Sequence, residues 1–309
     1  MTELDSIPVF VKVAQMGSFT QAARVLGMPN TTVSAKVAQL ERSLGITLMQ
    51  RTTRKLHLTE AGQTYLERCV RALAELEAAE SEITSNNGEI RGVLRITSSV
   101  DIGHSLLPRL VDRFLDSNPS AEVDLIVTNR MVDLVGEGVD VAIRAGRLKD
   151  SSLIAKKFMD SQFGLYASKS YLKEHGTPTI KTLEKFPFIK FTPFKNEPVE
   201  IANGSQKMMI NLKGPVQVDD LGAVRAMALL GRGIAILPDF VAETDVENSD
   251  LIQVVPEWVM TSGFFSLVYP PQRFVSPKVR AFIDSAEKFF AIDCAAAKKS
   301  RGTKSAKVK

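Results

Sequence analysis

The sequence predicts a multi-unit α/β protein, in which a small helical unit and one long helix precede a larger domain of alternating strands and helices. Three observations predict this organisation. The chain has 309 residues, which exceeds the roughly 100–200 residues of an ordinary domain. Apolar residues recur at helical spacing before Gly88. From Gly92 onward, short β-branched segments alternate with helical ones, as in βαβ sheets.

The composition is that of a globular protein, because 44% of the residues are hydrophobic and 24% are charged. No run of about 18 apolar residues is present to cross a bilayer. The N-terminal segment contains Asp5 and lacks the basic, apolar and small-residue regions of a secretory signal. Cys69 and Cys294 lie far apart in the sequence and provide no disulfide or zinc framework. We therefore expect a cytoplasmic protein without a membrane partner.

The net charge of +4 is unevenly distributed along the chain. Residues 1–60 hold seven basic and four acidic residues, a charge of +3, and residues 298–309 hold six basic residues and no acid. Residues 61–297 therefore carry −5. A polyanion is attracted to the two ends of the chain rather than to its middle. We expect a disordered, solvated tail at the C-terminus, and additional phosphate contacts are the alternative.

Three short helices are predicted before Gly45. The first ends at Gly17, and its inward face carries Leu4, Ile7, Phe10, Val11 and Ala14. Ser18 is a typical N-cap for the second, which ends at Gly27 and turns inward Phe19, Ala22, Ala23 and Leu26. The third begins near Thr31 after a tight turn, ends at Gly45, and buries Val33, Val37, Leu40 and Leu44.

The polar side of the third helix carries short donors and acceptors rather than the Glu and Lys residues of a solvated face. They are Asn30, Thr31, Thr32, Ser34, Lys36 and Gln39. Such side chains can reach base edges and phosphates in a major groove. Two short strands, 46–48 and 56–58, then flank the basic segment 51–55, which suits phosphates or the minor groove. Spacing alone fits equally well a plain three-helix unit with a solvated basic hairpin.

A long helix is predicted from Glu60 to about Asn87, with Thr59 as its cap. Its seam residues alternate at spacings of three and four, as in a coiled coil, and are Leu66, Cys69, Leu73, Leu76, Glu80 and Ile83. The helix would extend roughly 40 Å, so we expect it to pack against a partner helix. Glu80 interrupts the seam. Cys69 is expected to fill the seam rather than to act as a redox switch.

The remainder of the sequence, from Gly92 onward, predicts two α/β lobes. The first has strands at 93–100, 122–128 and 140–146, with helices at 103–119 and 132–138. The second has strands at 163–168, 187–191, 208–218, 234–237 and 264–269, and helices at 221–230 and 279–290. Lobes joined by crossing strands form a cleft, and ligands bind at the carboxyl ends of strands in open α/β sheets.

Polar groups gather at the strand ends of the first lobe. The candidates are Ser98, Ser99, Val100, Thr128, Asn129 and Arg144. Their hydroxyl and backbone N–H groups could hold an anionic metabolite, with Arg144 or Arg147 nearby. The alternative is that several of them only cap helices or pair strands. His104, near the same mouth, is expected to be a surface histidine rather than a sensor.

The segment 17–62 resembles the DNA-binding signature of LysR-type transcriptional regulators, because GSFTxAA, VS, LExxLG, RTTR and LTxAG occur in the family's order and spacing. The resemblance implies a winged helix-turn-helix and a homodimer through the linker helix, with two recognition helices on a pseudo-palindromic site. The positions that it implies for DNA contact are Asn30, Thr31, Thr32, Ser34, Lys36, Arg51, Thr53 and Arg54.

The chain departs from the family pattern at three places. Pro29–Asn30 stands where the family often has Ser-Gln, Ala35 where it often has Arg, and Met49 where it usually has Phe. These changes preserve the fold and leave open which base sequence is read.

The rest of the chain, to about residue 292, is similar to the LysR-type effector domain, a relative of type 2 periplasmic binding proteins. The similarity is carried by LPRLVDRFLDSNPSAEVDL, GVDVAIRAGRLKDSSLIAKKF, SYLKEHGTP, GRGIAILPDF and VYPPQRFVSPKVRAFID. It implies that Ile201, Asn203 and Phe264 line the pocket from the opposite lobe.

Other functional classes are disfavoured by the sequence. An enzyme of a common class would carry a motif such as GxSxG, HExxH, GxxxxGK[ST] or GxGxxG after a strand, and none is present. A periplasmic solute-binding protein would have a signal sequence in place of the N-terminal unit. A peroxide-sensing member of the family would have two cysteines in the sensing domain, and none lies between Gly92 and Asp293.

We therefore predict an α/β protein with an N-terminal winged helix-turn-helix (1–59), a linker helix for dimerisation (60–88), a two-lobed effector-binding domain (89–293) and a basic tail (294–309). The expected partners are double-stranded promoter DNA, a small-molecule effector and further copies of the chain in dimers or tetramers, with RNA polymerase as a further candidate. No cofactor, metal or catalytic residue is expected.

Overall fold

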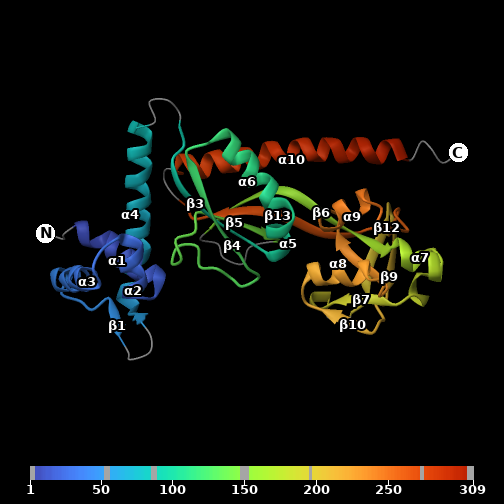
Figure 1. Ribbon diagram of the computed structural model, residues 1–309, viewed down its shortest axis with the longest axis horizontal. Coiled ribbons are helices and arrows are strands. Elements are labelled where there is room, and N and C mark those ends of the chain that lie inside the picture. The colour runs from blue at the N-terminus through green and yellow to red at the C-terminus, as the bar shows by residue number, and fades with distance from the viewer. Residues whose placement is uncertain are drawn as a thin grey trace.

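The molecule is a small helical unit joined to an elongated two-lobed domain (Figure 1). The long helix α4 (Glu60–Thr84) rises from the helical unit beside the domain, and the long helix α10 (Pro277–Lys304) runs along one edge of the domain. This computed structural model describes residues 4–51, 56–84, 89–146, 153–194, 197–271 and 275–304. The side chain of Gln15, in the helical unit, lies against Gly138 of the nearer lobe. No helix in these ranges is long and apolar enough to cross a membrane.

Three helices form the N-terminal unit. They are α1 (Ile7–Met16), preceded by a 3-10 turn (Leu4–Ser6), α2 (Phe19–Leu26) and α3 (Asn30–Leu44). The predicted caps are confirmed, since Gly17, Gly27 and Gly45 end the helices in the left-handed conformation and Ser18 Oγ accepts the N–H of Gln21. Leu4 was expected on the inward face but is 75% exposed, because it precedes α1 and does not share its helical repeat.

A two-stranded antiparallel hairpin, β1 (Met49–Arg51) with β2 (Leu56–Leu58), follows α3. The second strand is where the sequence predicts it. The first begins three residues later than predicted, and Ile46 is 49% exposed. The physical reason is that the backbone N–H groups of Leu48 and Met49 are bound by the side chain of Glu41, which fixes the chain before pairing starts.

Helix α4 (Glu60–Thr84) begins as predicted, with Thr59 Oγ1 accepting the N–H of Gly62 at 2.9 Å. Two expected seam residues do not face a partner helix. Leu66 and Cys69 are buried in the core of the N-terminal unit, at 1% and 5% exposure, whereas Leu76 is 60% exposed. Residues 85–88, the predicted hinge, lie outside the described residues.

The rear domain is built on one mixed sheet that runs through both lobes. Its strands are β3 (Gly92–Ser98), β4 (Ala121–Val127), β5 (Val141–Ala145), β6 (Ile154–Ser168), β7 (Phe188–Phe191), β10 (Val216–Val218), β11 (Ile234–Pro238), β12 (Leu251–Val254) and β13 (Met260–Tyr269). The order is β10-β7-β11-β6-β13-β5-β3-β4, and β12 also pairs with β6. A separate antiparallel hairpin is formed by β8 (Val199–Asn203) and β9 (Gln206–Ile210).

The long strands β6 and β13 pair antiparallel and connect the two lobes. Lobe I holds the parallel strands β3, β4 and β5 with α5 (Val100–His104), α6 (Leu106–Ser117) and α10 (Pro277–Lys304). Lobe II holds the remaining strands with α7 (Lys169–His175), α8 (Leu221–Leu229), α9 (Asp239–Glu247) and 3-10 turns at Leu183–Lys185 and Thr192–Phe194. Figure 1 shows α10 running along the outside of the domain away from α4.

Several features of this domain differ from the predictions. Residues 132–138 form a turn rather than a helix, because the carboxylate of Asp133 accepts the N–H of Gly136 and Gly138 has a φ of +65°. Helices α7 and α9 and strands β8 and β12 were not predicted. The expected disordered tail is helical as far as Lys304, because Ala295–Lys299 consists of strong helix formers.

Candidate nucleic-acid interface and effector cleft

The exposed face of α3 holds the residues predicted to contact bases. Asn30, Thr31 and Thr32 are exposed, and Ser34 and Lys36 are partly exposed. The opposite face is sealed, because Val33, Val37 and Leu40 are at most 2% exposed in the core of the N-terminal unit. The structure thus gathers these five polar residues at the start of one helix whose opposite face is packed into the core.

The wing stands next to this helix. In the hairpin, Met49 pairs with Leu58, Gln50 with His57, and Arg51 with Leu56. Arg51 therefore lies at the outer end of β1. Thr53 and Arg54, also predicted to contact DNA, lie outside the described residues.

The base of the wing is held by a residue that the sequence analysis did not single out. Glu41, near the end of α3, accepts backbone hydrogen bonds from Leu48 at 2.7 Å and Met49 at 3.0 Å. On the other side, Thr59 donates to the carbonyl oxygens of Leu48 and Thr47. The sequence does offer one signal for this role, because Glu41 is an acid in the last turns of α3, the helix that is predicted to face DNA.

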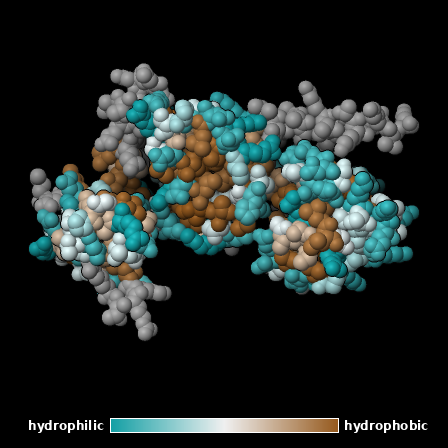
Figure 2. Space-filling model, in the orientation of Figure 1, coloured by the Kyte–Doolittle hydropathy of each residue, from teal (hydrophilic) through white to brown (hydrophobic). Residues whose placement is uncertain are grey.

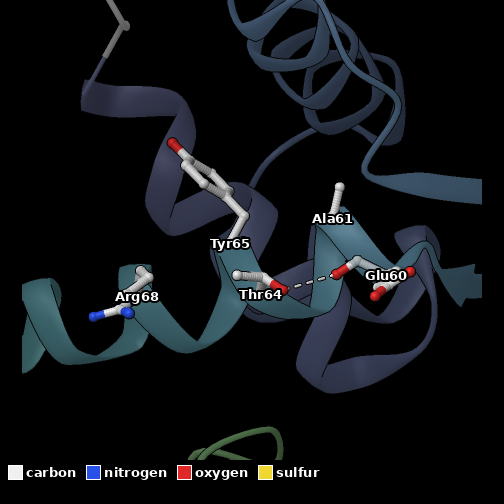
Figure 3. Close-up of a pocket in the computed structure, with 5 residues that line it drawn as sticks. All are labelled: Glu60, Ala61, Thr64, Tyr65 and Arg68. Carbon is white, nitrogen blue, oxygen red and sulfur yellow. Dashed lines mark hydrogen bonds between the residues drawn. The ribbon is translucent and has the colours of Figure 1, made fainter.

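A hollow of about 510 Å³ lies along the first two turns of α4 and is lined by Glu60, Ala61, Thr64, Tyr65 and Arg68 (Figure 3). Burial, with smaller contributions from Cys69, raises the pKa of Tyr65 to about 12, so the phenol is neutral at physiological pH. The Tyr65 ring packs against Phe10, with centroids 5.6 Å apart. The hollow therefore lies on the surface of α4, beside the packed rings of Phe10 and Tyr65.

The strand ends of lobe I converge as predicted. The backbone N–H of Val100 donates to the side-chain oxygen of Asn129 at 3.0 Å, and the N–H of Thr128 donates to the carbonyl of Ser98 at 2.9 Å. Phe264 of β13 joins this edge, because its carbonyl accepts the N–H of Gly146. The hydroxyl oxygen of Ser99 is buried and has no hydrogen-bond partner within the described residues. A buried donor of this kind is costly unless a ligand or water completes it.

Arg144 is held by lobe I itself. Its guanidinium donates to the carbonyl oxygens of Thr128 at 2.8 Å and Arg130 at 3.3 Å, and to Thr97 Oγ1 at 3.2 Å. Burial lowers its pKa from the usual arginine value. Its role in the structure is therefore to fix the loop that carries Thr128 and Asn129. Arg147, the other candidate cation, lies outside the described residues.

Two of the predicted effector residues, Ser98 and Ile201, do not reach an open surface. Ser98 is fully buried, with its hydroxyl donating to the carbonyl of Ser99. Ile201 is fully buried in the core of lobe II. Asn203 pairs with Gln206 at the end of the β8–β9 hairpin. A shallow hollow of about 430 Å³ lies on lobe II beside these strands, lined by Pro193, Phe194, Glu197, Pro198, Val199, Glu200, Ala202, Val259 and Met260.

Comparisons with known proteins agree with this two-part architecture. A model of the bacterial regulatory helix-turn-helix proteins of the lysR family matches residues 4–63. A model of the LysR substrate binding domain matches residues 87–291. The chain belongs to the LysR family of transcriptional regulators.

Several LysR-type relatives match almost the whole chain. An HTH-type transcriptional regulator of Xanthomonas campestris pv. campestris is 35% identical, and the match covers 91% of this chain and 84% of that one. The solved structure of CrgA, a LysR-type transcriptional regulator from Neisseria meningitidis, is 33% identical with a TM-score of 0.58, covering 94% of this chain and 99% of that one. The full-length virulence activator AphB of Vibrio cholerae is 28% identical with a TM-score of 0.57, covering 93% and 99%.

Family membership settles the general role of the two parts. The N-terminal unit is the DNA-binding part of a LysR-type transcriptional regulator, and the two-lobed domain is the part that binds a small-molecule effector. The predicted α/β fold class, with a helix-turn-helix before a two-lobed sensing domain, is confirmed.

Proposed function

We propose that this LysR-type regulator reads promoter DNA with the polar start of α3 in the major groove and the wing beside it. The observation that supports this most directly is the arrangement of α3, whose apolar face is sealed while Asn30, Thr31 and Thr32 are exposed. A recognition helix needs both properties, because base contacts are specific only when the backbone that carries them is held still. Arg51, Thr53 and Arg54 would supply phosphate contacts that position the helix.

We propose further that two copies associate through α4 and that dimers pair into tetramers through the sensing domains. In this arrangement the exposed Leu76 and the hollow beside Tyr65 contact the second copy, rather than Leu66 and Cys69, which are already buried. The protein would act in the cytoplasm, where promoter DNA and RNA polymerase are found. We assign it no catalytic step, because its relatives are named as transcriptional regulators.

The effector in this proposal is a small anion bound at the mouth of lobe I. The unpartnered hydroxyl of Ser99 supports this, together with Thr128 and Asn129 at the end of the neighbouring strand. Arg144 contributes positive potential and holds the loop, while its guanidinium donates to two backbone carbonyls and to Thr97 Oγ1. An effector shifts the regulator between two arrangements only by binding one of them more tightly.

DNA binding is tested without assuming an operator. Genomic fragments captured by the purified protein identify the preferred duplex, and fluorescence anisotropy on that duplex compares variants. We expect Ser34→Ala to change base preference, and Arg51→Ala to weaken all duplexes and to lower the salt slope by about 1. Arg232→Ala, an exposed arginine in lobe II, is the matched control and should behave as wild type. If neither Ser34→Ala nor Arg51→Ala alters binding, the assigned contacts are wrong.

The effector site is tested by thermal unfolding with a panel of small carboxylates and phosphates, each beside a neutral analogue of the same shape. We expect at least one anion to raise the unfolding temperature, and Ser99→Ala to reduce that shift. Ser43→Ala, an exposed serine outside the sensing domain, is the control. Equal shifts with the neutral analogues would overturn the anionic assignment, and an unchanged Ser99→Ala would overturn the site.

A further inference from the structure

One carboxylate connects the recognition helix to the wing. A single oxygen of Glu41, Oε1, accepts the backbone N–H groups of Leu48 at 2.7 Å and Met49 at 3.0 Å. Leu48 is the last residue before β1, and Met49 is the first residue of that strand. Both are buried, at 1% and 6% exposure. The position of the first wing strand is therefore set by a side chain of α3.

The carbonyl side of the same peptide is bound by the start of α4. The backbone N–H of Thr59 donates to Leu48 O at 3.0 Å, and its hydroxyl donates to the same oxygen at 3.3 Å. We call this set, Glu41, Leu48, Met49 and Thr59, the wing joint. Because the joint binds α3 at its N–H groups and α4 at its carbonyl, it ties the recognition helix, the wing and the linker helix together.

Several features of position 41 disfavour an acid in a DNA-binding unit. Glu41 lies in the last turns of α3, which ends at Leu44, where the helix dipole disfavours negative charge. It is partly buried, and it belongs to a unit of net positive charge whose partner is a polyanion. The compensating interaction is the pair of backbone hydrogen bonds, which are stronger to an ionised acceptor than to a neutral one.

We propose that Glu41 is a positioning residue for DNA binding, which fixes the wing relative to α3 so that both elements enter the duplex together. The proposal rests on the proposed function, because the wing must contact DNA for its position to matter. It adds a specific device to that function. The angle between helix and hairpin is set by a residue that touches no base or phosphate.

The sign of the effect separates positioning from electrostatics. Removing an acid from a DNA-binding unit strengthens binding if charge alone matters. The proposal predicts that Glu41→Ala instead weakens binding to the captured duplex by roughly tenfold, the equivalent of a hydrogen bond to a charged group. Glu41→Gln keeps an oxygen acceptor of the same reach and should bind at least as tightly as wild type. If Glu41→Ala binds as tightly as Glu41→Gln, the proposal is overturned.

A second variant keeps the proposal testable if Glu41→Ala unfolds. Glu41→Asp keeps the charge but shortens the side chain by one carbon, so the carboxylate no longer reaches both N–H groups. We expect Glu41→Asp to weaken DNA binding while its circular dichroism and unfolding temperature show a folded chain. Wild-type affinity in a folded Glu41→Asp protein would contradict a positioning role.

A double-mutant cycle identifies the element through which Glu41 acts. If the residue acts through the wing, the losses from Glu41→Asp and Arg51→Ala are less than additive, whereas those from Glu41→Asp and Ser34→Ala add. Full additivity with Arg51→Ala would overturn the proposal. If Arg51→Ala alone leaves binding unchanged, the wing contact of the proposed function fails. If Arg51→Ala weakens binding and the Glu41 variants do not, only the positioning role fails.

Discussion

Gly62 lies where the backbone of α4 passes closest to the base of the wing. A Cβ atom at this position would lie 2.0 Å from the carbonyl oxygen of Leu48 and 2.9 Å from its carbonyl carbon. The obstacle is backbone that is already hydrogen-bonded to Thr59, so neither side can move cheaply. The glycine of the LTxAG motif is thus required for close approach rather than for backbone freedom.

We expect Gly62→Ala to destabilise the N-terminal unit by about 1–3 kcal/mol, the usual cost of overpacking a tight contact. Denaturant unfolding followed by circular dichroism measures the change. Thr20→Ala, at an exposed position of α2 in the same unit, should be neutral or slightly stabilising because alanine is the better helix former. A Gly62→Ala protein as stable as wild type would show that α4 can shift away from the wing.

Glu137 forms an ion pair with Arg130 in lobe I. The guanidinium of Arg130 donates hydrogen bonds to its carboxylate, and this lowers the pKa of Glu137 below its ordinary value of 4.5. A carboxylate with a lowered pKa stabilises the folded state above its unfolded pKa, and the contribution is lost as the pH falls through the folded pKa. The pair is partly exposed, at 54% and 31%, so the effect is small.

We expect wild type to be slightly more stable than Glu137→Gln at neutral pH, and the difference to disappear as the pH falls below about 4. Thermal unfolding at a series of pH values from neutral to acidic gives both curves. Asp116→Asn, at an exposed position of α6 in the same lobe, is the control for the loss of a surface carboxylate. A difference that grows on acidification would contradict the assigned direction of the pKa.

At the scale of elements, α4 serves the fold of its own unit before it serves a dimer. Leu66 and Cys69 complete the core around Phe10 and Val37, and Leu73 packs at its edge. Leu76, one turn further, is 60% exposed and has left that core. The apolar surface available to a second copy therefore begins where the helix leaves the N-terminal unit.

We expect Leu76→Glu to weaken self-association strongly while the N-terminal unit stays folded, because a charge then replaces an apolar group in the proposed interface. Sedimentation velocity across a concentration series measures the change. Glu75→Gln, an exposed neighbour on the same turn, should leave the oligomeric state as it is. A dimer that tolerates Leu76→Glu would place the interface elsewhere on the chain.

The elements that sequence predicts well are those whose signals are local. The three helix-ending glycines, the Ser18 and Thr59 caps and the strands of lobe I follow from short-range backbone chemistry. The prediction that Leu66 and Cys69 face a partner helix is wrong, because they lie in the core of their own unit. Apolar residues at this spacing look alike whether they pack against a second copy or against the chain's own core. Periodicity does not identify the partner.

In the candidate site, too, some features could be predicted from the sequence and others could not. Strand ends placed Ser99, Thr128 and Asn129 together, because parallel strands present their carboxyl ends at one edge. The engagement of Arg144 by backbone carbonyls depends on the exact course of the 128–130 loop, which no short motif encodes. Glu41 is the acid of the LExxLG motif, and its role was missed because its partners are seven and eight residues away in the sequence.

At the scale of the whole molecule, the two lobes are parts of one sheet. Strands β6 and β13 each run through both lobes, and Phe240 of α9 in lobe II packs edge-on against Phe265 in the lobe I core at 5.5 Å. An ion pair of 3.0 Å between Arg109 and Glu243 joins α6 and α9 on the outside. Figure 2 shows an apolar area on the central part of the molecule and a smaller one on lobe II.

Helix α10 completes lobe I from the far end of the sequence. Phe282, Phe289 and Phe290 are at most 4% exposed in its core. We expect a chain ending at Pro271 to lose the cooperative unfolding of the sensing domain, because losing several such aromatic side chains at about 3–5 kcal/mol each exceeds the stability of a typical domain. Calorimetry should still detect the transition of the N-terminal unit.

The matched control is a chain ending at Asp293, which keeps Phe282 and Phe290 and removes only the basic end. It should show both transitions, as wild type does. A sensing domain that unfolds cooperatively without α10 would contradict the assignment of this helix to the lobe I core.

The order of the elements along the chain also decides which half can fold first during synthesis. The described apolar core of the DNA-binding half ends at Leu73, whereas the core of lobe I includes residues of β13 and α10, which are made near the end of translation. At roughly 5–20 residues per second, the residues that form the core of the DNA-binding half are synthesised many seconds before β13 and α10. We therefore expect the DNA-binding half to fold during synthesis before the effector-binding half.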